Sequence, residues 1–207
     1  MDQRRMRGQR NRQALIAAAA ELFDANGFEA TTVEQISAAA GVAPRTFFHH
    51  FATKEDILFD GYAERLDAAT RRFRASRSNT LSDALAEASA AVAEAISVQP
   101  DIFLVRAKMY ASHPALRATR LRINEDWIDQ MTEEVARRLD TDPLTDLRPR
   151  LAASVINGAN RAAIDAWVAG DGKGDLVETM AQAVDLLRPS IIRIEQLTLA
   201  DRARHAG

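Results

Sequence analysis

The stretch from Thr31 to Lys54 reads TTVEQISAAAGVAPRTFFHHFATK and predicts two short helices joined by a tight turn. Thr31 and Thr32 stand just before the first helix, and Glu34 and Gln35 follow each of them by three positions. That spacing is typical of a capping box, in which a threonine hydroxyl and the later side chain satisfy each other's backbone N–H groups. The pattern therefore places the start of a helix at these two threonines.

The turn and the second helix follow from Gly41 and Pro44. Glycine ends helices because it accepts a positive φ, and proline suits a first helical turn, where its missing N–H would have no partner. Phe47 and Phe51 fall four residues apart on one face and predict the buried side. The opposite side then exposes residues that can contact the edges of bases in a major groove, namely Arg45, Thr46, Phe48, His49 and His50.

A basic arm precedes this pair of helices. Residues 1–12 hold five arginines against one acidic residue, whereas the rest of the chain is net acidic and the whole has a formal charge of −2. The arm could be a disordered tail, but its place ahead of a helix-turn-helix favours contact with DNA phosphates or a minor groove. Arg4, Arg5 and Arg7 are the arm residues predicted to bind DNA.

The composition of the 207 residues is that of an all-α globular protein, with 47 % apolar residues and no cysteine. The absence of cysteine excludes disulfides, thiol chemistry and zinc fingers. The chain shows neither a signal peptide nor an apolar run long enough to span a membrane, so we expect a cytoplasmic protein.

About nine helices are predicted in all. The first runs over about 11–26, and the fourth runs from Thr53, with Asp56 completing its capping box, to about Arg74 as one continuous helix. Further helical patterns cover 81–97, 100–112, 114–139, 147–169 and 175–200, with a kink or restart expected at Pro189. This predicts a DNA-binding domain over 1–52, a connecting helix and linker over 53–79, and an effector-binding and dimerisation domain over 80–200.

The first quarter of the chain resembles the DNA-binding domain of TetR-family transcriptional regulators. The shared residues are Ala18, Gly27-Phe28, Thr31-Thr32, Ile36, Ala39-Ala40-Gly41-Val42, the run Thr46 to Phe51, and Lys54-Glu55. The resemblance implies that Thr32 and Lys54 contact phosphates, and that Arg45, Thr46, His49 and His50 reach base edges or phosphates. Where the family usually has a tyrosine whose hydroxyl contacts a phosphate, this chain has Phe48, which can only touch a thymine methyl group.

The resemblance also implies a homodimer on a palindromic operator, and a repressor that a small molecule releases. The last two long helices would form the dimer interface through apolar residues, and the fourth helix would transmit effector binding to the recognition helices. The interface residues expected here are Ala159, Ala163, Val184, Leu187 and Ile191.

A polar stripe on the helix over 147–169 is the main candidate outside the DNA-binding domain. Ser154, Asn157, Arg161 and Asp165 recur at helical spacing. The stripe could be a solvated face, a polar patch in a dimer interface, or a cavity wall in which Asn157 and Arg161 orient a ligand. In the last case, the further ligand-binding residues would be Phe103, Arg106, Met109, Tyr110, Trp127 and Met131, although residues of these kinds also form ordinary cores.

The stretch from Arg106 to Arg120 resembles one TetR subgroup, the mycofactocin-system regulators, whose C-terminal domain binds acyl-CoA-like ligands. The shared residues are His113-Pro114-Ala115-Leu116-Arg117-Ala118, and Trp167 further on. The resemblance implies a fatty-acyl or acyl-CoA-like effector, with Arg106, Arg117, Arg120 or Arg161 pairing with its polar groups.

Other kinds of function find little support in the sequence. Adjacent helical residues point about 100° apart, so His49 and His50 cannot chelate one metal ion alone. The sequence GDGKG at 170–174 lacks the spacing of a phosphate-binding loop. No cofactor is expected. Two alternatives stay open: a helical enzyme using His113, Arg161 and Asp165, and a DNA-binding dimer that takes no effector.

Overall fold

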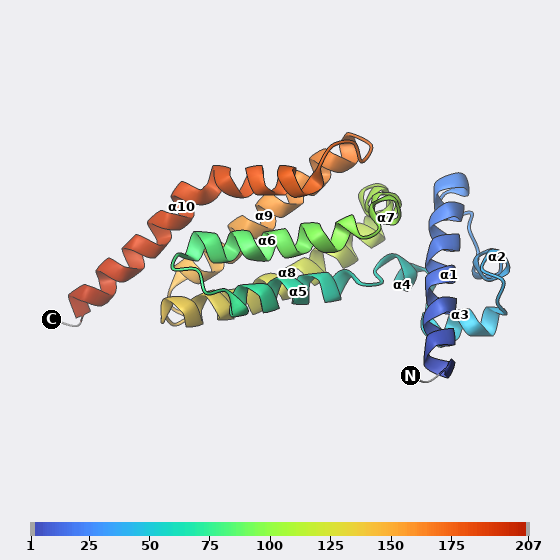
Figure 1. Cartoon of the computed structure of the whole chain (residues 1–207), viewed down its shortest axis with the longest axis horizontal. Helices are drawn as coiled ribbons and strands as arrows, with labels where there is room; N and C mark the ends of the chain where they lie inside the picture. Colours follow the sequence, from blue (N-terminus) through green and yellow to red (C-terminus); the bar gives the residue numbers. More distant parts are fainter. Residues whose placement is uncertain (1–2, 206–207) are drawn as a thin grey trace. The chain divides into compact units, whose positions relative to one another are not determined.

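The structure is a computed structural model that describes residues 3–205, so that Met1 and Asp2 of the arm and the last two residues of the chain lie outside it. The described residues form ten helices and no strand (Figure 1). These are α1 (Gln3–Asn26), α2 (Val33–Ala39), α3 (Pro44–His50), α4 (Lys54–Leu58), α5 (Tyr62–Ala75), α6 (Leu81–Ser97), α7 (Pro100–Ser112), α8 (Pro114–Leu139), α9 (Leu147–Ala169) and α10 (Leu176–His205). The predicted all-α fold is confirmed.

The chain divides into two compact units. The first comprises Met1–Gly61 together with Asp101–Arg117, and the second comprises Tyr62–Pro100 and Ala118–Gly207. The first unit therefore contains the helix-turn-helix and also α7, which the sequence assigned to the effector region.

The basic arm is helical in this structure. Helix α1 begins at Gln3, eight residues before the predicted start at position 11, and continues without a break to Asn26. Leu15, Ala18, Ala19 and Phe23 form its buried side, as predicted. The expectation of a separate arm is thus corrected, because the arginines lie on the first turns of the same helix that packs against α2 and α3.

The helix-turn-helix forms through the caps that the sequence predicted, with one correction. Thr32 is the N-cap of α2 and shares a complete capping box with Gln35. Thr31 is buried instead, and its hydroxyl donates to the carbonyl oxygens of Gly27 at 2.8 Å and Leu22 at 3.2 Å. After α2, Gly41 takes a φ of +66°, the left-handed conformation that ends a helix at little cost for glycine.

The predicted fourth helix is two helices. Thr53 caps α4 with Asp56 as expected, but α4 ends at Leu58 and α5 begins only at Tyr62. Gly61 between them has a φ of +70°, which is incompatible with a continuing right-handed helix. One of the three boundaries between the two units falls directly after this glycine, so no continuous helix crosses it, whereas α8 continues through the boundary after Arg117.

The second unit consists of long helices packed around an apolar core. Helix α6 packs against α5 and α10, and α10 packs against α9 (Figure 1). Four of the predicted dimer-interface residues are buried inside the core of a single copy, so their side chains are not available for contacts with a second copy. These are Ala159, Ala163, Val184 and Ile191. Helix α10 continues through Pro189 rather than restarting.

Membrane-spanning helices and metal-binding clusters are two further features that would indicate a function class. No single helix between residues 3 and 205 is long and apolar enough to cross a membrane, and only α6 and α7 taken together meet the length and composition. Within the same residues, no three His, Asp or Glu side chains gather where they could hold a metal ion.

Candidate nucleic-acid interface

Helix α3 presents the predicted face to solvent because Phe47 anchors its other side. Phe47 is fully buried, and its ring centroid lies 5.5 Å from that of Phe51. Arg45 and His49 are exposed, and the Phe48 ring is 56 % exposed. An aromatic ring left this open at the surface of a small unit is available for a partner.

Two predicted phosphate contacts have different surroundings. Thr32 is exposed at the N-terminus of α2, and its hydroxyl oxygen accepts the Gln35 N–H at 3.2 Å, which leaves its own O–H to donate to a ligand. Lys54 instead turns inward, and its Nζ donates to the carbonyl oxygens of Phe28 at 2.9 Å, Thr31 at 3.2 Å and Glu29 at 3.5 Å. An ammonium group has three donors, so this arrangement leaves none for the predicted phosphate.

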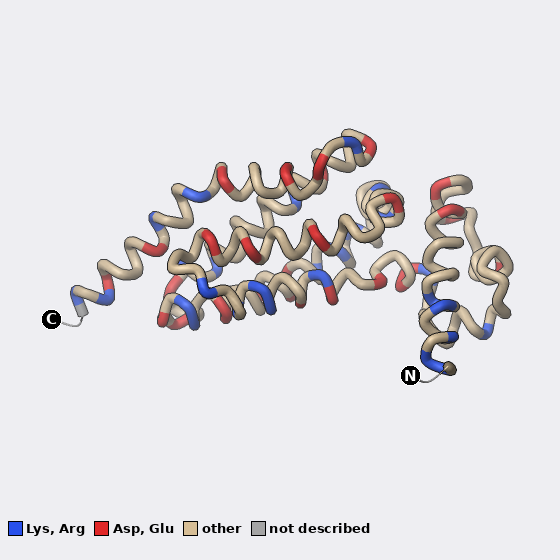
Figure 2. The backbone as a smooth tube through the Cα atoms, in the orientation of Figure 1, with Lys and Arg blue, Asp and Glu red and all other residues tan. Residues whose placement is uncertain are grey.

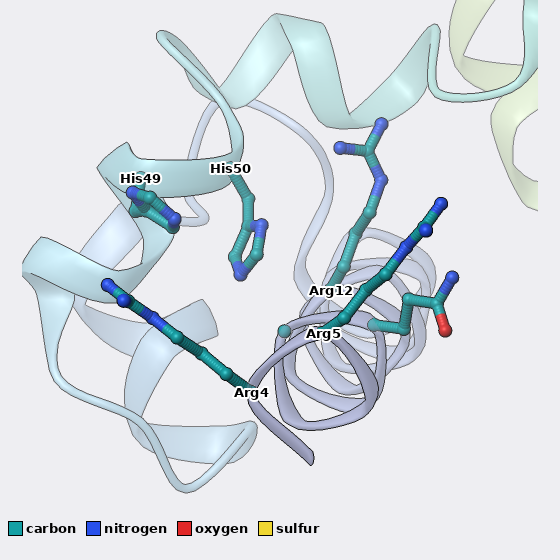
Figure 3. Close-up of a pocket in the computed structure, with 7 residues that line it drawn as sticks. Arg4, Arg5, Arg12, His49 and His50 are labelled. Atoms are coloured by element: carbon teal, nitrogen blue, oxygen red, sulfur yellow. The ribbon is translucent and has the colours of Figure 1, made fainter. Parts of the chain in front are cut away.

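A groove of about 390 Å³ lies between the first turns of α1 and the end of α3. The Arg4 side chain reaches from α1 toward His49 and the His50 ring points toward α1, whereas the Arg5 and Arg12 side chains extend away from the two rings (Figure 3). A methyl group at Gly8 would stand 4.0 Å from Cε1 of His50, which shows how closely α1 and this ring approach. The groove is lined by Arg4, Arg5, Gly8, Gln9, Arg12, His49 and His50.

The charge along α1 suits a partner rather than the helix itself. Figure 2 shows basic residues at the N-terminal end of α1 and acidic residues at its other end. The first turn of α1 has no acidic residue and its last turn has no basic one. Both placements oppose the helix dipole, which favours anions at the N-terminus and cations at the C-terminus. A cationic N-terminal end is nevertheless well suited to bind phosphates.

Arg12 is the charged residue of the groove that was not among the predicted DNA-binding residues. It forms an ion pair with Asp60, and its guanidinium lies 4.9 Å above the centroid of the Phe51 ring. The sequence signal for Arg12 was its helical spacing from the earlier arginines. This signal was missed because residues 1–10 were expected to form a separate arm and not the first turns of α1. Of the predicted arm residues, the structure brings Arg4 and Arg5 into this groove, while Arg7 is not part of its lining.

The groove alters the protonation of His50. Partial burial lowers the pKa of His50 below 6.5, and the nearby His49 and the Arg12 guanidinium lower it further. In the free protein the imidazole is therefore mostly neutral near pH 7. A phosphate placed in the groove would have the opposite effect on this pKa, because an anion stabilises the imidazolium.

DNA affinity is therefore expected to rise as pH falls from about 8 to 6, because binding takes up a proton at His50. The stability of the free protein should move the other way: the unfolded chain binds the His50 proton more readily, so stability falls as pH drops through the range just below 6.5. Fluorescence anisotropy with labelled DNA at several pH values measures the first, and thermal unfolding measures the second. The His50→Gln variant should flatten the affinity profile, and an unchanged profile would exclude His50 as the proton acceptor.

The predicted ligand-binding residues are divided between the two units. Phe103, Arg106, Met109 and Tyr110 belong to the first. Arg106 and Tyr110 are buried there and donate hydrogen bonds to backbone carbonyls at the end of α4.

Trp127, Met131, Asn157 and Arg161 belong to the second unit. Met131 is fully buried, and the Trp127 indole N–H donates to the Leu66 carbonyl and the Thr70 hydroxyl, both at 3.0 Å. The polar stripe of α9 faces mostly outward, with the Arg161 and Asp165 side chains about half exposed. The buried polar residue of α9 is Asn160, whose side-chain oxygen accepts a hydrogen bond of 2.5 Å from Ser89.

A second polar cluster joins α5, α8 and α9 within the second unit. The Asn124 amide donates to the Tyr62 hydroxyl at 2.8 Å, and burial raises the pKa of Tyr62. The Arg120 side chain is only 12 % exposed, its Nη1 lies 3.7 Å from Asp165, and its buried Nε has no hydrogen-bond partner. A mostly buried guanidinium with an unmatched donor is costly unless an anion completes it. Sequence reasoning included Arg120 only among four arginines and missed Tyr62 and Asn124.

The chain matches two family models. Residues 15–60 match the model described as bacterial regulatory proteins of the tetR family, and residues 79–191 match that of the MftR C-terminal domain. The first match covers the helix-turn-helix, and the second covers more than half of the chain.

Two curated relatives and one solved structure agree with these matches. The chain is 33 % identical over 199 residues to the HTH-type transcriptional regulator TcmR of Streptomyces glaucescens, covering 91 % of this chain and 87 % of TcmR. It is 28 % identical over 185 residues to the putative mycofactocin biosynthesis transcriptional regulator MftR of Mycobacterium tuberculosis, covering 86 % and 89 %.

The solved structure is FadR of Bacillus subtilis in complex with stearoyl-CoA. It shares the fold with a TM-score of 0.63 and 23 % identity, covering 84 % of this chain and 96 % of FadR. These proteins are transcriptional regulators rather than enzymes. With its helix-turn-helix, its cationic groove and these matches, the chain belongs to the TetR family of DNA-binding transcriptional regulators.

Proposed function

We propose that this protein is a cytoplasmic repressor that binds a palindromic operator as a homodimer and leaves it when an acyl-type anionic effector binds. The observation that carries the DNA-binding part is the exposed face of α3 beside a groove in which three arginines and two histidines gather. One such unit makes few base contacts, so tight specific binding requires two copies across a twofold axis.

The surface of the second unit supports a dimer. Helices α9 and α10 expose several large apolar side chains, which the association of two copies would remove from water. Leu186 is 82 % exposed and Leu147 72 %, and further exposed residues on the same helices are Leu151, Val177, Leu197 and Leu199. These residues replace the buried ones predicted from the sequence as the expected contacts between two copies.

Binding of the protein to fragments of its own genome tests the proposal. Footprinting should protect an inverted repeat, and light scattering should give the mass of a dimer both free and on DNA. Affinity should fall steeply with salt. For each phosphate neutralised, the logarithm of the binding constant should fall by about 0.9 for every tenfold rise in salt concentration. Equal affinity for all fragments, or a monomer on a single half-site, would refute the proposal.

Arg120 is the residue proposed to bind the anionic part of the effector. Of the four arginines suggested by sequence, Arg106 is bonded to backbone carbonyls, and Arg117 and Arg161 are exposed. Arg120 combines burial with an unmatched donor, and Tyr62 and Asn124 lie in the same cluster. A carboxylate, phosphate or thioester oxygen would complete this cluster with charge-assisted hydrogen bonds.

The Arg120→Met variant should need roughly 10- to 100-fold more stearoyl-CoA for half release from DNA, because a hydrogen bond to a charged group contributes about 1.5–3 kcal/mol. Its affinity for DNA without effector should stay near that of the wild type. Anisotropy of labelled operator, titrated with stearoyl-CoA, measures both. Arg122→Met is the control, since Arg122 lies on the same helix with its side chain 70 % exposed. An equal response of both variants would remove Arg120 from the site.

A further inference from the structure

The end of α4 is the point from which the further inference starts. The last carbonyls of a helix have no partners within it, and they must be satisfied by other groups when they are buried. Helix α4 has only five residues, and Phe59 to Gly61 leave the helical path directly after it. Its C-terminal carbonyls therefore need donors from elsewhere in the chain.

Helix α7 supplies these donors. Arg106 donates from Nη2 to the Ile57 carbonyl at 2.8 Å and from Nη1 to the Asp60 carbonyl at 2.9 Å. The Tyr110 hydroxyl donates to the Leu58 carbonyl, and its ring stacks on Phe59 with centroids 4.9 Å apart. Arg106 is 8 % exposed and Tyr110 1 %, so solvent does not compete for these bonds. We call this set of contacts the α7 clamp.

The α7 clamp is connected to the groove through Asp60. The backbone carbonyl of Asp60 accepts from Arg106, while its carboxylate pairs with Arg12 of α1. Arg12 lies over Phe51 at the end of α3 and lines the groove with His50. Three contacts thus join α7 to the surface proposed to bind DNA, all within the first unit.

The course of the chain makes α7 a means of control. The segment Asp101–Arg117 belongs to the first unit, but the chain enters it from Pro100 and leaves it at Ala118, which both belong to the second. A rearrangement of α6 or α8 can therefore reach α7 directly through the chain at one of its ends. Because α4 and α5 are separated at Gly61, they provide no rigid helix for the same purpose.

We infer that Arg106 and Tyr110 are positioning residues, which hold the end of α4, and through Asp60 and Arg12 the groove, in the arrangement that binds DNA. This inference rests on the proposed function. An effector that displaces α7 would break these bonds, and a protein lacking them would resemble the effector-bound state even when no effector is present.

The test compares Tyr110→Phe, which removes one hydroxyl and keeps the stacked ring, with Arg106→Lys, which keeps the charge and loses the two-carbonyl geometry. Each should weaken specific operator binding by roughly 2- to 30-fold and reduce by a similar factor the further loss that stearoyl-CoA causes. Thr198→Val and Arg122→Met are the controls, because they remove a buried hydroxyl and an exposed guanidinium from the second unit. Both controls should leave operator binding unchanged.

Hydrogen exchange of the free protein provides a measurement that does not depend on operator binding. The amides of 57–61 and of the α3 end should lose protection in Tyr110→Phe and keep it in Thr198→Val. Variants with wild-type affinity, wild-type effector response and wild-type exchange would overturn the inference. If the wild type binds no operator, the proposed function fails. The exchange experiment still tests the α7 clamp in that case: loss of amide protection at α4 and α3 in Tyr110→Phe would support the clamp, and unchanged protection would refute it.

Discussion

Replacing Arg45 with alanine is expected to weaken binding to the specific operator by about 1–3 kcal/mol and to relax the preference at one base pair. Arg45 is exposed on the first turn of α3, one residue after Pro44. The N-terminal residues of a recognition helix contact base edges, and a guanidinium donates two parallel hydrogen bonds to guanine. The loss should therefore depend on sequence rather than apply to all DNA equally.

Anisotropy with a set of operators, each changed at one base pair, measures this effect. Non-specific affinity should change little for Arg45→Ala, because the α1 arginines remain. Arg71→Ala removes an exposed arginine of α5 in the second unit and serves as the control. If Arg45→Ala reads every operator of the set as the wild type does, α3 is not the recognition helix.

Replacing Phe47 with alanine is expected to destabilise the first unit by about 3–5 kcal/mol, the usual loss for a buried phenylalanine. The Phe47 side chain is fully buried and lies between the rings of Phe48 and Phe51, with centroid distances of 5.5 Å to each. Its removal leaves a cavity under α3 that the short helix cannot fill. A loss of this size is a large part of the stability of a small unit, so DNA binding should fall with it.

Phe48→Ala provides a control of the same residue type one position away. Its ring is 56 % exposed, so stability should change by less than about 0.5 kcal/mol, as for most surface substitutions. Its affinity for operators with a thymine at the contact should still fall. Urea unfolding, monitored by a spectroscopic probe attached to the first unit, measures the free energy of unfolding of both variants. Equal destabilisation by both would contradict the assignment of the buried face.

The helix-turn-helix was predictable because its signals are local. Thr32 with Gln35, Gly41 and Pro44 each set the backbone within a few residues, and Phe47 and Phe51 fix the buried face by their spacing. The cap of α4 at Thr53 followed from the same reasoning. Once the buried face of α3 was assigned, the remaining residues had to form its exposed face. The structure places Arg45, Phe48 and His49 on the surface, as this reasoning predicted.

The errors arose where distant parts of the chain decide the outcome. Lys54 resembles a phosphate ligand in sequence, but three carbonyls of the α1–α2 connection occupy its ammonium group. Arg106 was predicted as a ligand-binding residue, and its guanidinium donates to backbone carbonyls about fifty residues earlier in the chain. The break at Gly61 was the one error with a local signal, since a glycine stood inside an otherwise continuous helical pattern.

The helical N-terminus of α1 has a consequence for the kind of DNA that the protein can select. A flexible tail would find a phosphate at many distances and lose conformational freedom on binding, whereas this segment is ordered before the DNA arrives. Residues 3–10 extend about 12 Å along a rigid axis. Arg4 and Arg5 thus stand at a fixed separation from α3, and a duplex whose strands are spaced differently would not meet both at once. The protein would then discriminate among operators by the width of their grooves as well as by their bases.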